Sequence, residues 1–287
     1  MVGRRIVGRT FVLMLLGLVP LSRAQRTAEV LSFRPLVPGL ELLQGLVVVG
    51  GKRVQITAVR GSPRMYRVEV SVAQNPNIGD SIVSFQEHSQ AAVVLSGGFL
   101  TSFYPPIPLG IVKRSRVLVN RAAGGDLLNG LLLVRAGRAS IEPFRGAAGV
   151  AEWDDALQSG PMLLYGGHSA LPNVAEIGTR STRQLIENEY SRAFVATLPD
   201  NQFLLAVTGA VSLRALVDLL ARPAPQGGLA CLNALNLSGG GSEGMLVRAG
   251  AKQISSGNIR SYLANVILLR EMATRGPRRA MPVPGRK

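Results

Sequence analysis

Three short loops rich in glycine and serine have the residue types and spacing best suited to chemistry. They are Ser96-Gly97-Gly98-Phe99, Ser159-Gly160-Pro161 and Ser238-Gly239-Gly240-Gly241-Ser242, and each follows or adjoins an apolar segment that reads as a buried strand. Because glycine has no Cβ, such loops let backbone N–H groups converge, which suits an anion such as phosphate. Taken singly, each loop is equally well explained as a tight turn. None fits GxxxxGK[ST] or a GxGxxG that opens a helix, so no motif supports nucleotide binding.

The elements that must position these loops are mostly short strands. Alternating polar and apolar residues predict strands, and Pro, Gly, Asn and Asp mark the turns between them. Ser212 can cap a helix that runs to about Ala221, with Leu213, Leu216, Val217 and Leu220 on one face. The expected strands and hairpins lie at 45–73, 91–95, 112–119, 130–141, 162–165, 192–208, 231–237 and 245–254. We therefore expect an α+β fold: a single mixed domain rich in antiparallel hairpins with a few helices.

Composition excludes several classes of protein. With 47% hydrophobic residues in 287, the chain can bury a core and is not wholly disordered. Its one cysteine, Cys231, excludes an intramolecular disulfide, and with only two histidines it argues against a Cys/His zinc site. The formal charge of +15 suggests an anionic partner.

Much of that charge lies at the two ends of the chain. Residues 1–24 carry arginines ahead of an apolar run and are predicted to be a signal peptide cleaved after Ala24, with an uncleaved anchor as the alternative. Residues 25–44 are expected to be a linker, 45–274 the domain, and 275–287 a basic disordered tail. Without leader and tail, 23 basic and 17 acidic residues remain. We expect a secreted or periplasmic protein that binds no nucleic acid and contacts membranes at most peripherally, through its tail.

In chain order, these segments resemble the phosphodiester glycosidase family over roughly residues 85–250. Members of that family carry a strand followed by Asn-Gly-Gly-Phe, then Gly-Gly-Pro-x-Leu, then Pro-Arg-Thr-Ala before a hairpin and helix, and finally Ala-Leu-Asn-Leu-Asp-Gly-Gly-Gly-Ser. The corresponding segments here are Leu95-Ser96-Gly97-Gly98-Phe99-Leu100, Ser159-Gly160-Pro161-Met162-Leu163, Ser191-Arg192-Ala193-Phe194 and Ala234-Leu235-Asn236-Leu237-Ser238-Gly239-Gly240-Gly241-Ser242. Ser96, Ala193 and Ser238 replace the family's Asn, Thr and Asp.

The chemistry implied by the resemblance is attack of water or a carboxylate at the anomeric carbon of a sugar 1-phosphodiester. Such a site needs cationic and N–H stabilisation of the phosphate, which the resemblance assigns to Arg192 and the loop amides, and a base near the sugar. Because Ser238 stands where the family has its carboxylate, Glu243 is the nearest replacement in the sequence. Five other carboxylates could be brought in by folding: Asp154, Asp155, Glu176, Glu187 and Glu189.

The predicted site therefore has two groups of residues. The catalytic group is Arg192, Ser238 and Glu243, and the substrate-binding group is Ser96, Gly97, Gly98, Gly160, Asn236, Gly239, Gly240, Gly241 and Ser242. No cofactor or metal is predicted, although a divalent cation held by carboxylates and phosphate would leave no readable motif.

Several of these residues have a plainer explanation. Arg192 reads equally as an ion-paired residue on a strand surface, and Glu243 as a solvated residue at the start of a hairpin. His88 and His168 read as surface residues and Cys231 as an inert core residue. Trp153 either stacks on a sugar ring or packs.

Two functions of different classes follow. The first is an exported glycosidase-like enzyme that hydrolyses or binds sugar-1-phosphodiester linkages of an envelope or extracellular glycan. The alternative is a catalytically degenerate relative that only binds phosphorylated glycan or polysaccharide. A third reading, adhesion to anionic lipid or polysaccharide through the basic tail, depends on charge alone.

Overall fold

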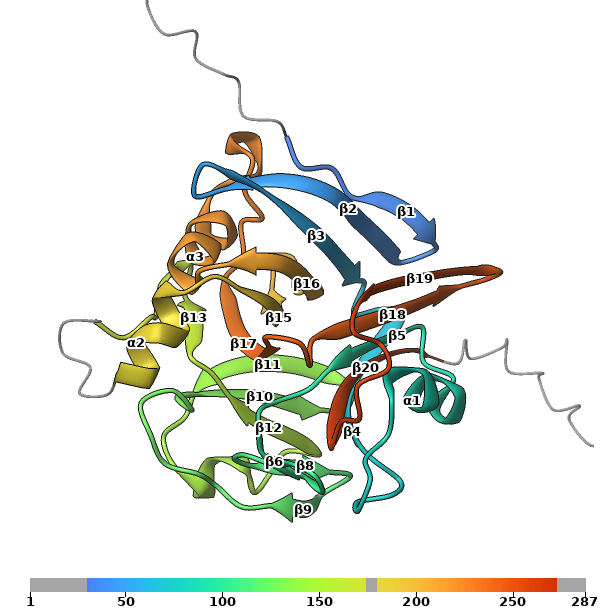
Figure 1. The fold of residues 1–287 in the computed structure, drawn as a ribbon. Coiled ribbons are helices and arrows are strands. Elements are labelled where there is room, and N and C mark those ends of the chain that lie inside the picture. The colour runs from blue at the N-terminus through green and yellow to red at the C-terminus, as the bar shows by residue number, and fades with distance from the viewer. Residues whose placement is uncertain (1–29, 174–179, 273–287) are drawn as a thin grey trace, which may run out of the picture.

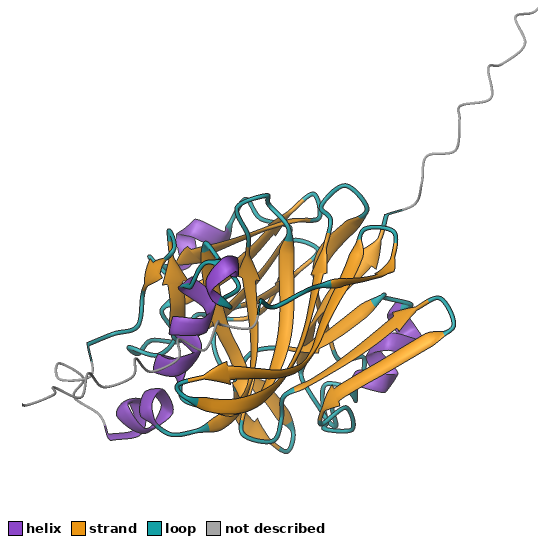
Figure 2. Ribbon diagram, turned by 90° about the horizontal axis from the view of Figure 1, so that it is seen from above, coloured by secondary structure: helices purple, strands orange, loops and turns teal. Residues whose placement is uncertain are grey.

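The computed structural model describes residues 30–173 and 180–272 and is built mainly from antiparallel strands (Figures 1 and 2). An eight-stranded sheet has the order β1 (Arg34–Val37), β2 (Leu40–Val49), β3 (Lys52–Gly61), β16 (Phe203–Val211), β15 (Tyr190–Thr197), β17 (Asn233–Gly239), β13 (Met162–Tyr165) and β14 (His168–Ser169). A five-stranded sheet has the order β11 (Arg138–Pro143), β10 (Gly130–Arg135), β12 (Asp155–Ser159), β8 (Val112–Arg114) and β9 (Val117–Asn120). A second has the order β19 (Lys252–Gly257), β18 (Gly244–Ala249), β5 (Val93–Ser96), β20 (Asn265–Glu271) and β4 (Tyr66–Val72).

The remaining elements are few and short. A hairpin joins β6 (Leu100–Phe103) to β7 (Pro106–Pro108). The helices are α1 (Ile82–Ser89), α2 (Arg180–Glu187) and α3 (Leu213–Ala221), with 3₁₀ turns at Ala147–Val150 and Ala224–Gln226. The fold is strand-rich α+β, which confirms the expected class. None of the helices in the described ranges has the length and hydrophobicity needed to cross a membrane.

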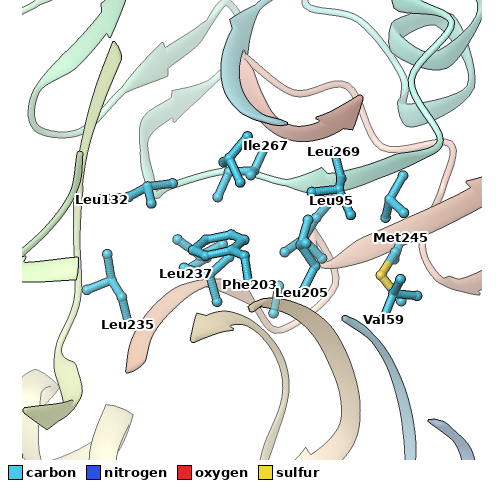
Figure 3. Close-up of a cluster of buried hydrophobic side chains, with 14 of the residues drawn as sticks. Val59, Leu95, Leu132, Phe203, Leu205, Leu235, Leu237, Met245, Ile267 and Leu269 are labelled. Atoms are coloured by element: carbon cyan, nitrogen blue, oxygen red, sulfur yellow. The ribbon is translucent and has the colours of Figure 1, made fainter. Parts of the chain in front are cut away.

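The main core lies where the three large sheets face one another. Leu205 of β16 and Leu235 of β17 meet Leu132 of β10 and Leu95 of β5 there (Figure 3). Alternate residues of these strands point into this core because successive side chains of a strand face opposite sides of its sheet. The core thus fixes the relative positions of the strands that end in the glycine loops.

The other face of the eight-stranded sheet is covered by α2 and α3 (Figure 1). Helix α3 begins where the sequence predicted, because the Ser212 Oγ caps it by accepting from Ala215 N at 3.3 Å. Its apolar face, including Leu216 and Leu220, is buried against the sheet. Phe194 and Ala234 occupy the facing positions on β15 and β17.

Strand β20 is central to its sheet but the sequence analysis assigned no element to it. It pairs with both β4 and β5. Its run of consecutive apolar residues shows no alternation because both faces are buried: Ile267 lies in the main core, and Val266 packs with α1. A short continuous apolar run does not distinguish a strand from a buried helix.

The linker predicted for residues 25–44 is wrong over most of the part that the structure describes. Strand β1 begins at Arg34 and β2 at Leu40, where Leu40 and Leu42 are fully buried in the main core. The predicted leader 1–24, its cleavage point at Ala24, and the tail 275–287 lie outside the described residues.

Candidate functional site

The three glycine loops meet. Ser238 N donates to Gly97 O at 3.0 Å, which joins the first loop to the third. Asn236 Nδ2 donates to Gly160 O at 2.8 Å, which joins the third to the second. The first loop also approaches the residue before the second, since a Cβ added to Gly98 would lie 3.5 Å from Gln158 O. Three loops that are far apart in the sequence therefore lie next to one another in the fold.

Close backbone approach explains two of the glycines. A Cβ on Gly97 would collide with the side chain and carbonyl of Asn265, and one on Gly160 with Leu127 O. Only glycine lets the chain pass at such distances. These positions are thus set by packing around the site.

Ser96 and Ser238 form a buried pair at the meeting point. They are 0% and 4% exposed, and Ser238 Oγ donates to Ser96 Oγ at 2.8 Å. Ser96 Oγ also accepts from Gly244 N at 3.1 Å. The two hydroxyls satisfy one another and carry no charge, so the serine pair is suited to holding the loops in register.

Only part of the third loop reaches solvent. Gly240 and Gly241 are exposed, with positive φ angles of 69° and 116° and open space around a Cβ. Their amides already have protein acceptors: Gly240 N donates to Ser191 O at 3.1 Å, and Gly241 N to Glu243 Oε2 at 2.6 Å. The predicted cradle of free amides is therefore partly filled by the protein itself.

Glu243 is not the solvated residue that its plainer explanation supposed. It is 6% exposed and lies directly beneath the loop, with its carboxylate bonded to the Gly241 amide. The Gly241 amide therefore donates to the Glu243 carboxylate and is not available to a phosphate oxygen.

Arg192 is buried beside the site but faces away from solvent. It pairs with Gly239 across β15 and β17 and is 1% exposed. Its guanidinium donates to three backbone carbonyls, Val211 O at 3.2 Å, Leu185 O at 2.8 Å and Asn188 O at 2.9 Å. Burial lowers its pKa to about 10. These contacts differ from both sequence-based explanations, a phosphate ligand and a surface ion pair, because the polar partners are carbonyls of the chain itself.

Three buried polar atoms at the meeting point have no hydrogen-bond partner within the described part of the chain. They are Asn236 Oδ1, Ser159 Oγ and Asn265 Nδ2. Asn236 is 1% exposed, and its Nδ2 donates to the carbonyls of Gly160 and Leu237. Buried polar groups are normally paired, so these atoms mark a place for water or a polar ligand.

Two further segments at the site were missed by sequence reasoning. Asn265, the first residue of β20, accepts from Gly98 N through Oδ1 at 3.0 Å. The segment 258–261 covers the third loop, where Asn258 Nδ2 and Ser261 Oγ donate to Gly241 O at 3.0 and 3.2 Å. This segment also carries Arg260, whose side chain is exposed. Isolated Asn, Ser and Arg residues outside the glycine motifs gave no signal in the sequence.

The other predicted carboxylates have partners elsewhere. Asp154 bonds Arg116 and Ala136 N, and Asp155 accepts from Val70 N and Ser115 N. Glu189 pairs with Lys52. Glu187 is exposed at the end of α2, and Glu176 lies outside the described residues.

The residues expected to be inert are placed as predicted. His88 and His168 are exposed. Cys231 is buried, and burial raises the pKa of its thiol to about 12. Within the described ranges, no group of three or more His, Cys, Asp and Glu residues could hold a metal ion.

Comparison with known proteins assigns the family. The phosphodiester glycosidase family model matches residues 89–270, more than half of the chain, so the chain belongs to that family.

Solved structures share the fold at low sequence identity. The catalytic domain of zebrafish N-acetylglucosamine-1-phosphodiester alpha-N-acetylglucosaminidase, auto-inhibited by its pro-peptide, aligns with a TM-score of 0.65 and 15% identity over 85% of this chain and 87% of its own. A hypothetical protein from Synechocystis aligns with a TM-score of 0.58 and 16% identity over 83% of this chain and 63% of its own. A protein from Burkholderia pseudomallei K96243 aligns with a TM-score of 0.57 and 13% identity over 76% of this chain and 74% of its own. Curated protein sequences provide no match.

Proposed function

We propose that this protein binds the sugar-1-phosphodiester linkage of an envelope or extracellular glycan at its three glycine loops. The observation that carries the proposal is that the loops meet around unpartnered buried polar atoms, beneath an exposed Gly240-Gly241 segment. Membership of the family and the likeness to a phosphodiester alpha-N-acetylglucosaminidase fold support the choice of ligand.

In this proposal the residues around the third loop have three different roles: hydrogen bonding to the phosphate, supplying a positive charge, and positioning the loop. Ser242, half-buried next to the exposed glycines, offers its hydroxyl and amide to the phosphate. Arg260 supplies the cation, because its segment is bonded to Gly241 O and its side chain is exposed. Arg192 is a positioning residue. Its hydrogen bonds to the end of α2 hold β15 in place, and β15 contains Ser191, whose carbonyl accepts from Gly240 N.

Binding without turnover is favoured because Glu243 is the one carboxylate that contacts the loops within the described part of the chain. Ordinary glycoside hydrolysis uses a carboxyl pair, whereas here two serines bond each other and Glu243 stands alone among the described residues that contact the loops. The negative charge of Glu243 also repels a phosphate placed at the same loop.

Hydrolysis by Glu243 is the second candidate, favoured by the burial of this carboxylate next to the loop. In that case a water oxygen attacks the anomeric carbon and its proton passes to the Glu243 carboxylate. The bond from the anomeric carbon to the phosphate oxygen breaks, leaving free sugar and a phosphomonoester.

One assay separates the two candidates. The purified protein is incubated with UDP-N-acetylglucosamine, binding is measured by calorimetry, and free sugar by product analysis. Binding without release of sugar, strengthened about fivefold in Glu243→Gln because a charge repulsion is removed, supports the binding protein. Release of sugar that Glu243→Gln abolishes supports the enzyme. Absence of both binding and release contradicts the proposal.

Two further variants sharpen the assignment. Arg260→Gln is expected to weaken binding about tenfold, whereas Arg248→Gln, which removes an exposed arginine of β18, leaves it unchanged. Equal loss in both would show that net charge rather than a local contact is responsible. Ser238→Asp restores the family's residue, and sugar release by that variant alone would identify Ser238 as the cause of lost turnover.

We also propose that the protein is exported. The arginine-led apolar stretch in residues 1–24 supports this, and the Burkholderia neighbour is named as a candidate exported protein. Cell fractionation with a C-terminal tag tests it, since a protein retained in the cytoplasm at full length would contradict export.

A further inference from the structure

A concave region lies at the opposite end of strands β4 and β20 from the glycine loops. Two cavities of about 850 and 410 Å³ adjoin there and share Arg64, Tyr66 and Arg138 among their lining residues. Tyr66 pairs with Glu271 at one end of the ladder between β4 and β20, while Asn265, which holds Gly98, pairs with Val72 at the other end. We call the region lined by Arg64, Arg135, Arg138 and Trp153 the arginine groove.

The β10–β11 turn holds one wall of this groove in place. Ala136 and Gly137 take positive φ angles of 50° and 76°, which makes a tight hairpin turn. Gly137 O accepts from Val68 N at 2.9 Å, and Ala136 N donates to Asp154 Oδ2 at 2.8 Å. The turn that carries Arg135 and Arg138 is therefore fixed to β4 on one side and to the start of β12 on the other.

The charge of the groove is only partly compensated. The larger cavity is lined by three arginines and by no Asp or Glu, and the smaller one by Arg64, Arg138 and Asp200. Arg135 pairs with the exposed Glu152 at 2.7 Å and stands 5.1 Å over the Trp153 ring. Arg64 and Arg138 are exposed and make no ion pair with any described residue. Two guanidinium groups that line the same cavities and make no ion pair with a described residue attract an anion that offers several oxygen acceptors.

We propose that the arginine groove binds an acidic polysaccharide, whose carboxylate or phosphate groups pair with Arg64 and Arg138. A saccharide fits better than a nucleic acid because both aromatic residues of the larger cavity are engaged: Tyr66 is buried, and Trp153 packs against a hydrophobic cluster with Arg135 over its ring. A chain-like ligand fits because the adjoining cavities form an extended depression. The groove shares no residue with the glycine loops, so this proposal is independent of the proposed function.

The single tryptophan of the sequence makes the groove directly observable. Trp153 lines it, so its fluorescence reports binding at this place. The full protein is titrated with an alginate hexasaccharide at low salt, and with neutral maltohexaose and hexaglutamate as comparison ligands. We expect a saturable change with the alginate hexasaccharide, no change with maltohexaose, a weaker response to hexaglutamate, and loss of the signal in ~0.5 M NaCl.

A pair of charge-matched double variants tests the residues. Arg64→Gln/Arg138→Gln removes the two unpaired cations of the groove, and Arg53→Gln/Arg214→Gln removes two exposed arginines on β3 and α3. We expect the groove variant to raise the dissociation constant about tenfold or more and the control variant less than about twofold. All four positions are exposed, so both variants should keep the melting temperature of the wild type.

Three results would overturn the proposal: equal loss of affinity in both double variants, no fluorescence change with the alginate hexasaccharide, or tighter binding of hexaglutamate, which would indicate an acidic protein partner. The outcome is separable from that of the proposed function. Glu243→Gln and Ser238→Asp should leave alginate binding unchanged, and Arg64→Gln/Arg138→Gln should leave binding of UDP-N-acetylglucosamine unchanged.

Discussion

Replacing Arg192 by methionine is expected to destabilise the protein without exposing any new charge. The substitution keeps an unbranched apolar side chain but removes three hydrogen bonds to Val211 O, Leu185 O and Asn188 O. At about 1 kcal/mol for each carbonyl left without its partner, the loss is about 3 kcal/mol. The cost of burying a guanidinium is also removed, so the figure is well below the gross strength of three charge-assisted bonds.

Thermal unfolding measures this loss. For a domain of this size about 3 kcal/mol corresponds to a fall of about 6–12 °C in melting temperature. Arg214→Met on the exposed face of α3 is the matched control and should change it by no more than about 2 °C. If Arg192→Met keeps the wild-type melting temperature while losing phosphosugar binding, the positioning role is wrong and Arg192 contacts the ligand.

Four further predictions concern single features of the chain. Cys231 should not react with a thiol reagent at pH 8 until the protein unfolds. Because the thiol's pKa is about 12 in the folded state and 9.0 in the unfolded state, its contribution to the free energy of unfolding should decrease as pH rises from 9 to 12. Cys231→Ala should lack that decrease. Gly97→Ala should cost about 2–3 kcal/mol through its collision with Asn265, the first residue of β20, and Gly240→Ala about 1 kcal/mol through its positive φ. Gly124→Ala, in open space without a positive φ, should be neutral in urea unfolding. Deleting residues 275–287, which carry five basic residues and no acid, should release the protein from anionic vesicles at low salt; unchanged sedimentation with vesicles would refute a role for the tail. Treatment with EDTA should not alter phosphosugar binding, and a loss restored by Mg²⁺ or Ca²⁺ would show a required cation.

The arrangement of the strands was predictable where turn residues and alternation coincide. Pro199-Asp200-Asn201 predicts the β15–β16 hairpin, and Ser212 predicts the start of α3, because both signals act within a few residues. The grouping of the glycine loops into one site was predicted from the resemblance to the family and not from any local pattern. Strand β20 was not predicted because its burial on both faces is a property of the folded sheets, which a local pattern does not contain.

The roles of individual site residues were less predictable because they depend on contacts between distant segments. Nothing near Glu243 in the sequence indicates that its carboxylate turns back to the Gly241 amide. Arg192 has no acidic neighbour that would reveal its partners, which are carbonyls at the end of α2 and in β16. Asn265 reaches Gly98 only because β20 pairs with β5.

Backbone amide hydrogen exchange in the presence and absence of UDP-N-acetylglucosamine tests the central claim most directly. If the glycine loops bind the phosphodiester, the amides of Gly239–Ser242 and of the segment 258–261 should become protected, while those of the β10–β11 turn in the arginine groove should not change. Protection confined to the arginine groove, or absent from the whole protein at saturating ligand, would contradict the assignment of the site.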